Sequence, residues 1–147
     1  MYKRILLAYD GSESGQKALL DCKDLAALAH AEVFLVAVMP PATSYVAFEG
    51  GVYESTPEER EQQQQHYNQI LAEGLQRLTE SGHTASGEIV VGESVDSITQ
   101  YARRIEADLI VVGHKHLDSW AARWWRGSTS RALIEHANCS VLVVIVK

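Results

Sequence analysis

The stretch KRILLAYDGS, residues 3–12, runs from a continuous apolar segment into a turn. A strand that is apolar at consecutive positions is buried on both faces, as in parallel sheets covered by helices. The triplet Asp-Gly-Ser at residues 10–12 favours a turn. Apolar residues then recur at steps of three and four over residues 18–29, which predicts a helix. The N-terminal segment therefore predicts a strand, a turn and a helix in succession.

The same succession repeats along the rest of the chain. Further apolar strands are predicted at residues 32–38, 86–91, 108–112 and 140–146, and further helices at 57–82, 95–105 and 128–136. The second helix has an explicit start, because Thr56 suits the N-cap, Pro57 the first position, and Glu59 a capping box. Residues 40–56 are rich in Pro, Gly, Ser and Thr and predict a surface excursion. The alternation predicts one doubly wound α/β domain over residues 1–147, a five-stranded parallel sheet with helices on both faces.

Composition limits the class of protein. Hydrophobic residues make up 46% and charged residues 22% of the chain, as in an ordinary globular domain. No apolar run approaches the roughly 18 residues of a membrane helix, and the chain starts as a strand, so we expect a cytoplasmic protein without a membrane partner. The net charge of −6 argues against a nucleic-acid partner. Cys22 and Cys139 lack metal-ligand spacing and are expected to be reduced, buried thiols.

Two loops, residues 10–14 and 113–128, follow strands at the edge where doubly wound sheets bind ligands. Asp10 can accept a hydrogen bond from a ribose or base, or instead form a turn that caps the next helix. Gly113 permits a ligand to approach the backbone, or instead serves a turn with positive φ. Residues 127–129, Gly-Ser-Thr, lead into a helix N-terminus that suits phosphate oxygens, or instead form a plain N-cap. Lys115 reaches phosphates or only solubilises its loop.

The middle of the second loop, residues 114–126, is rich in aromatic residues. Trp120, Trp124 and Trp125 share one face if the segment is helical, which predicts packing onto the protein or a partner rather than base stacking. Two histidines, at positions 114 and 116, have no partner ligand that the sequence sets, so we expect no metal site. The P-loop motif G-x-x-x-x-G-K-[ST] and the dinucleotide motif G-x-G-x-x-G are absent from the chain, and no catalytic pair is evident. We expect no enzyme, with weak nucleotide hydrolysis as the remaining enzymatic alternative.

Three blocks of the sequence are distinctive: KRILLAYDGSE at 3–13, DLIVVGH at 108–114, and GSTSRALIEHANCSVLVV at 127–144. Together they resemble the universal stress protein family, in the family's order and over a chain of the family's length. The resemblance implies the strand order 3-2-1-4-5 and homodimers that pair through the last strand, here Val141–Val146. That strand is uninterrupted and apolar, and an uncovered edge of this kind favours pairing with another chain. For one subgroup, the resemblance also implies ATP bound between the loops after strands one and four.

The subgroup that binds ATP has G-x-x-G, then nine residues, then G-[ST]. Gly113 matches the first glycine, His116 stands at the second, and ten residues precede Gly127. Asp10 matches an aspartate that contacts the nucleoside, and Val38 a backbone contact to the base. The pattern G-H-x-x-x-D-x-W at residues 113–120 is more similar to a second subgroup, which is regarded as not binding ATP. The chain combines features of both subgroups.

We therefore expect a stress-response homodimer with ATP or AMP, accompanied by Mg²⁺, as a regulatory ligand. The alternative is a protein–protein interaction module that docks through residues 114–126 and binds no nucleotide. The predicted site consists of Ala8, Asp10, Val38, Val112, Gly113, Lys115, His116, Gly127, Ser128 and Thr129.

Overall fold

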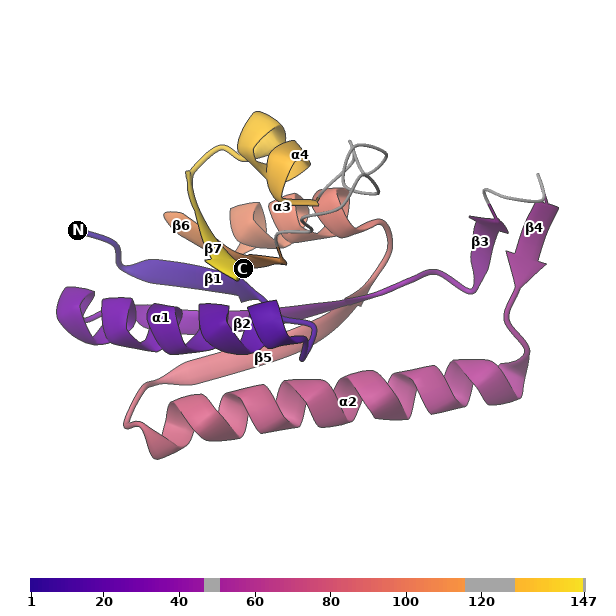
Figure 1. Cartoon of the computed structure of the whole chain (residues 1–147), viewed down its shortest axis with the longest axis horizontal. Helices are drawn as coiled ribbons and strands as arrows, with labels where there is room; N and C mark the ends of the chain where they lie inside the picture. The colour runs from indigo at the N-terminus through magenta and orange to yellow at the C-terminus, as the bar shows by residue number, and fades with distance from the viewer. Residues whose placement is uncertain (47–50, 116–128, 147) are drawn as a thin grey trace.

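The computed structural model describes residues 1–46, 51–115 and 129–146. A five-stranded parallel sheet has the order β5-β2-β1-β6-β7, which confirms the predicted doubly wound fold and its strand order (Figure 1). Its strands are β1 (Arg4–Ala8), β2 (Glu32–Met39), β5 (Ala85–Val91), β6 (Leu109–Lys115) and β7 (Ser140–Val146). The order reverses between β1 and β6, because the chain leaves β1 toward β2 and later returns to its other side.

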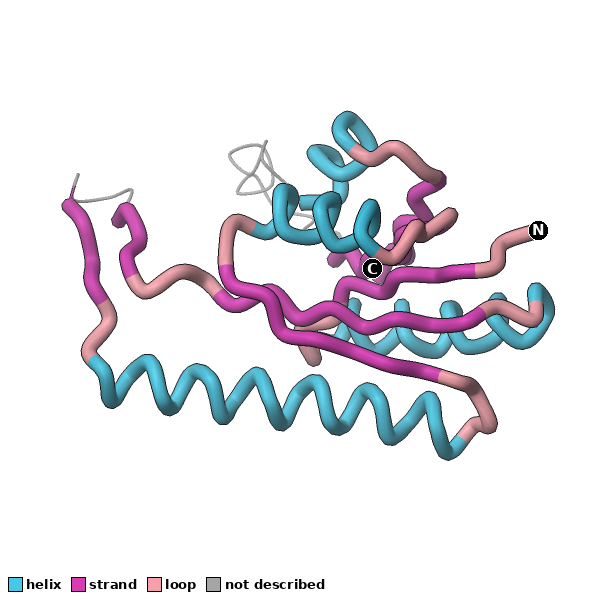
Figure 2. The backbone as a smooth tube through the Cα atoms, turned by 180° about the vertical axis from the view of Figure 1, so that it is seen from behind, coloured by secondary structure: helices cyan, strands magenta, loops and turns pink. Residues whose placement is uncertain are grey.

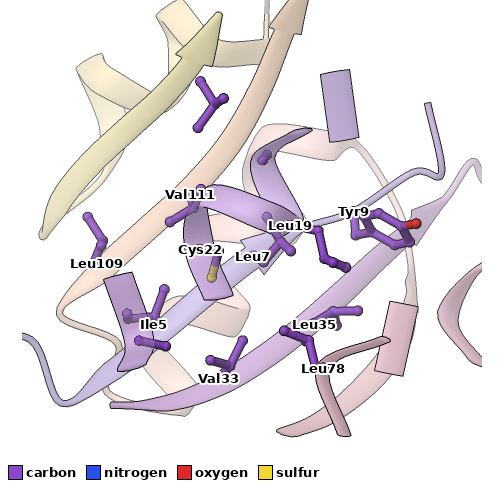
Figure 3. Packing of buried hydrophobic residues seen from close by; sticks show 13 residues of the cluster. Ile5, Leu7, Tyr9, Leu19, Cys22, Val33, Leu35, Leu78, Leu109 and Val111 are labelled. Carbon is purple, nitrogen blue, oxygen red and sulfur yellow. The ribbon is translucent and has the colours of Figure 1, made fainter. Parts of the chain in front are cut away.

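Helices cover both faces of the sheet (Figures 1 and 2). They are α1 (Glu13–Ala29) and α2 (Pro57–Glu80) on one face, and α3 (Ser94–Arg104) and α4 (Thr129–His136) on the other. Successive residues of β1 point to opposite faces, so Ile5 and Leu7 pack with α1, whereas Leu6 packs with α3 and α4. All three side chains are fully buried. Figure 3 shows the first of these cores, where Leu7, Leu35 and Cys22 lie between α1 and the sheet.

The capping box at the start of α2 is confirmed. Thr56 Oγ1 accepts from Glu59 N at 3.2 Å, and Glu59 Oε2 accepts from Thr56 N at 2.9 Å. The excursion before α2 contains a feature that the sequence did not predict, an antiparallel hairpin of β3 (Thr43–Val46) and β4 (Gly51–Glu54). Both views show this hairpin away from the main sheet, beyond the start of α2 (Figures 1 and 2). No described helix is long and apolar enough to cross a membrane.

The amino end of β1 is tied to its neighbours by hydrogen bonds. The two carboxylate oxygens of Asp108 each accept a hydrogen bond from a backbone amide. The donors are Arg4 N, the first residue of β1, at 3.1 Å, and Lys3 N, the residue before it, at 2.8 Å. Asp108 N in turn donates to Arg4 O at 3.0 Å, and Glu32 N donates to Lys3 O at 2.9 Å. These bonds hold the starts of β1, β2 and β6 in register.

Both cysteines are free, as expected, but they differ in burial. Cys22 is fully buried on α1, and burial raises the pKa of its thiol to about 12. Cys139 is only half-buried just before β7, which corrects the expectation that both thiols are buried. Burial raises the pKa of Cys139, and the nearby Asp108 carboxylate raises it further.

Candidate functional site

A cavity of about 180 Å³ lies at the carboxyl ends of β1 and β6, where the strand order reverses. Ligands of doubly wound sheets bind at this position. The residues that line it come from β1, β2, β6, α1, α3 and α4 and from the loop after β1: Ala8, Tyr9, Asp10, Gly15, Val36, Val38, Ser94, Ile98, Val112, Gly113 and Thr129. Drug-sized ligands usually occupy roughly 300–1,000 Å³, so this cavity matches only part of a nucleotide.

Most of the described residues of the predicted site come together at this cavity. They are Ala8, Asp10, Val38, Val112, Gly113 and Thr129. Lys115 does not line it; its ammonium lies 3.7 Å from the carboxylate of Glu13. His116, Gly127 and Ser128 lie outside the described residues, as does most of the predicted docking loop, 114–126, with its three tryptophans.

Asp10 makes the turn that was one of its two predicted roles. Its Oδ1 accepts from Ser12 N at 3.0 Å and from Ser12 Oγ at 2.5 Å. Ser12 is the N-cap of α1 and accepts from Gly15 N at 3.1 Å. Asp10 therefore positions the cap rather than capping the helix itself. Asp10 is also exposed at the cavity, so the turn and a ligand contact are compatible.

A glycine is required at position 113 because two backbone segments pack closely there. The two roles predicted for it, ligand approach to the backbone and a turn with positive φ, did not include this packing. A Cβ atom built on Gly113 would lie 2.2 Å from Ser14 O and 2.9 Å from Gly15 N. These separations are far below van der Waals contact, and the obstructing atoms are backbone. Gly113 is also not among the described glycines with positive φ. Its absence of a side chain lets β6 pass directly against the start of α1.

The backbone of Val38 faces the cavity from β2. In the observed register, Glu32 N donates to Lys3 O and Tyr9 N donates to Val36 O at 2.9 Å, so alternate residues of β2 face β1. Val38 is the next residue on this side, but β1 has ended there. Its N–H and C=O therefore point past the end of β1, toward the cavity that Val38 lines.

Five lining residues were not predicted: Tyr9, Gly15, Val36, Ser94 and Ile98. A signal was present for two of them. Ser94 begins α3, which follows a strand and so starts at the same edge as α1. Ile98 lies one helical turn further, on the apolar face of α3. The third strand-to-helix connection of the sheet therefore contributes to the site as well.

Tyr9 contributes mainly from behind the cavity, since its ring packs in the core under α1 and α2 (Figure 3). The side chain is 2% exposed, and within the described parts of the chain its hydroxyl makes no well-formed hydrogen bond, although the Gln16 side chain lies close enough to lower its pKa. Burial raises the pKa of Tyr9, and the Arg77 guanidinium opposes that shift.

In the described ranges 1–46, 51–115 and 129–146, no three His, Cys, Asp or Glu side chains lie close enough together to hold a metal ion.

Comparison with known proteins agrees with this fold. The model of the universal stress protein family matches residues 1–144. The chain belongs to this family. A universal stress protein of Synechocystis is 29% identical over 97% of this chain and 97% of its own length. A putative universal stress protein of Staphylococcus epidermidis is 32% identical, over 97% of this chain and 84% of its own length.

Solved structures of family members have the same fold. One from Burkholderia pseudomallei aligns with a TM-score of 0.75 and 26% identity, over 97% of this chain and 96% of its own. A universal stress protein in complex with cAMP aligns with a TM-score of 0.73 and 23% identity, over 99% and 98% of the two chains. The family member from Archaeoglobus fulgidus in complex with dAMP aligns with a TM-score of 0.67 and 20% identity, over 97% and 98%.

Proposed function

We propose that this family member is a stress-response protein that binds an adenine nucleotide as a regulatory ligand and has no catalytic role of its own. The observation that carries the proposal is the cavity at the β1/β6 reversal, where the Val38 backbone and the Asp10 carboxylate face the same space. Adenine presents an acceptor ring nitrogen beside a donor amino group, which complements a backbone N–H and C=O on one residue. The complexes of relatives with cAMP and dAMP support this ligand class.

Each part of the ligand has a matching part of the site. The base lies in the apolar slot of Val36, Val38 and Ile98, and Asp10 accepts from a ribose hydroxyl. Phosphate lies toward Thr129 at the start of α4, because the N–H groups of a helix N-terminus attract anions. Mg²⁺ accompanies the phosphates when the ligand is ATP. We place this function in the cytoplasm and in a single domain.

Calorimetric titration of the full chain with AMP, and with ATP and Mg²⁺, tests the proposal. We expect saturable binding that Asp10→Ala weakens about tenfold or more, since the contact is charge-assisted. Asp21→Ala is a matched control, because Asp21 is an exposed carboxylate on the middle of α1 that does not line the cavity. Unchanged binding in Asp10→Ala would place the nucleotide elsewhere. No binding by any adenine compound would favour the docking module of residues 114–126.

We also propose that the protein is a homodimer paired through β7. Both β7 and β5 are edges of the sheet, and among the described residues the β5 strand carries an ion pair, Glu88 with Arg104 of α3 at 2.5 Å. The β7 edge exposes Leu142 and Ile145 instead. Charges on an edge strand oppose strand pairing, and an apolar edge favours it.

Sedimentation equilibrium tests the proposed dimer. The double substitution Leu142→Lys and Ile145→Lys adds charges to β7, and we expect it to convert a dimer to a monomer at micromolar concentration. Val91→Lys is the control, because Val91 is comparably exposed on the opposite edge strand. A monomeric parent protein, or a dimer that only Val91→Lys disrupts, would refute pairing through β7.

A further inference from the structure

Three of the described helices, α1, α3 and α4, begin beside the cavity, and their N-termini differ in charge. Ser94 and Thr129, the first residues of α3 and α4, line it, and so does Gly15 in the first turn of α1. Each helix N-terminus carries a partial positive charge that a phosphate can use. The first turns of α1 and α3 already contain carboxylates, Glu13 and Asp96, whereas the first turn of α4 contains none.

A glutamate occupies the N-terminus of α3. The two carboxylate oxygens of Glu93 accept from Val95 N at 3.1 Å and from Asp96 N at 3.0 Å. These are the N–H groups that a phosphate at this helix would use. Glu93 does not itself line the cavity, but its carboxylate occupies the N-terminus of the helix whose first residue, Ser94, does.

The N-terminus of α1 is occupied as well. Ser12 Oγ accepts from Gly15 N, and Asp10 Oδ1 accepts from Ser12 N. The approach of Gly113 to the Ser14 backbone leaves no space for a phosphate between β6 and this helix. Glu13 also lies 3.7 Å from the Lys115 ammonium, so this lysine is already paired with a carboxylate.

We infer that the site selects an adenine nucleotide with a single phosphate group over ATP, and that Glu93 and Glu13 determine this selectivity. The inference rests on the proposed function. One helix N-terminus without its own carboxylate, that of α4, accommodates one phosphate at the cavity. A further phosphate at either of the other two helix N-termini meets a carboxylate already there, Glu13 at α1 or Glu93 at α3, and like charges repel.

Titrations of the full chain with adenosine, AMP and ATP in the presence of EDTA test the inference, because chelation leaves the phosphate charges uncompensated. We expect AMP to bind at least about tenfold more tightly than ATP, as expected for additional like charges a few ångströms away. Equal or tighter binding of ATP would overturn the selectivity and leave the nucleotide site itself intact. Failure of all three adenine compounds to bind would overturn the proposed function, and the inference with it.

Substitutions identify the residues responsible. Glu93→Gln keeps a side-chain acceptor for the α3 cap and removes its charge, so we expect the AMP-to-ATP affinity ratio to fall about threefold or more. Glu13→Gln releases Lys115 and is expected to act in the same direction. Glu32→Gln is the matched control, because it removes the same charge at the amino end of the sheet. An unchanged ratio in both Glu93→Gln and Glu13→Gln, with melting temperatures like the parent's, would overturn their role.

Discussion

The two ends of β1 each have an aspartate beside them, and the two aspartates differ in what they bind. At the amino end, both carboxylate oxygens of Asp108 accept hydrogen bonds from backbone amides, those of Lys3 and Arg4. At the carboxyl end, Asp10 holds the Ser12 turn through one oxygen and faces a cavity. The comparison shows that one end of the strand is closed by internal hydrogen bonds, and the other keeps polar groups available for a ligand.

The largest effect of a substitution on stability is expected near the carboxyl end of β1, where β6 packs against α1. Gly113→Ala places a methyl group 2.2 Å from Ser14 O, so the strand and helix must move apart. We expect a loss of about 3 kcal/mol in the free energy of unfolding, together with loss of nucleotide binding. Denaturant unfolding measures the first quantity. Gly82→Ala is a contrasting control, since open space surrounds Gly82 and only its positive φ of 82° opposes the change. A Gly113→Ala protein as stable as the parent would contradict the packing.

Substitutions of Asp108 and Asp10 are expected to differ in their effects, the first mainly on the free energy of unfolding and the second mainly on nucleotide affinity. Asp108→Ala leaves the Lys3 and Arg4 amides without their charged partner, and we expect it to cost about 2 kcal/mol of stability with nucleotide affinity unchanged. Asp10→Ala is expected to reduce affinity about tenfold or more and to cost less stability than Asp108→Ala. Chemical denaturation and calorimetry on both variants check this. Similar effects of the two substitutions on binding would remove the distinction between the ends.

A smaller effect is expected at Tyr9, directly after β1. Its hydroxyl is buried and makes no well-formed hydrogen bond in the described structure, with only the Gln16 side chain near it, and a poorly satisfied buried polar group is unfavourable. Tyr9→Phe is therefore expected to be neutral or to stabilise the fold by up to about 1 kcal/mol. Tyr101→Phe serves as the comparison, because the Tyr101 hydroxyl interacts with Arg104, so its removal is expected to be less favourable than that of the Tyr9 hydroxyl. A clear destabilisation by Tyr9→Phe would show that the hydroxyl has a bound partner.

The smallest effect is expected at the closed end, on the Cys139 thiol. Burial raises the pKa of Cys139, and so does the Asp108 carboxylate, because a nearby negative charge disfavours the thiolate. Asp108→Asn should lower this pKa toward the ordinary thiol value, so that alkylation at a fixed pH near 8 becomes faster. Alkylation rates across a pH series measure the shift. Cys22, whose pKa is raised to about 12, should react only after unfolding in both proteins. An unchanged pKa for Cys139 would exclude the influence of Asp108.

Local patterns predicted the strands and helices well where apolar periodicity was strong. The start of α2 was predicted to the residue, because the capping box is a contact between residues three apart. The β3–β4 hairpin was missed, since Pro, Gly and Ser in residues 40–56 suggested only loop. Sequence patterns predicted the lining of the candidate cavity in the loops after β1 and β6, but not at Ser94 and Ile98, which reach the same cavity from a third connection.

The sequence by itself determined the alternation of strands and helices and the edge of the sheet where a ligand site would lie. These follow from hydrophobic periodicity and from the rule that parallel strands end at a common edge. Only the tertiary structure decided why residue 113 is glycine, because the obstructing Ser14 backbone is distant in the sequence. It also decided that Lys115 pairs with Glu13 and that Glu93 occupies the α3 terminus facing the cavity. Charged side chains and backbone segments that are distant in the sequence come into contact only when the sheet forms. A local sequence pattern therefore cannot predict how close they lie.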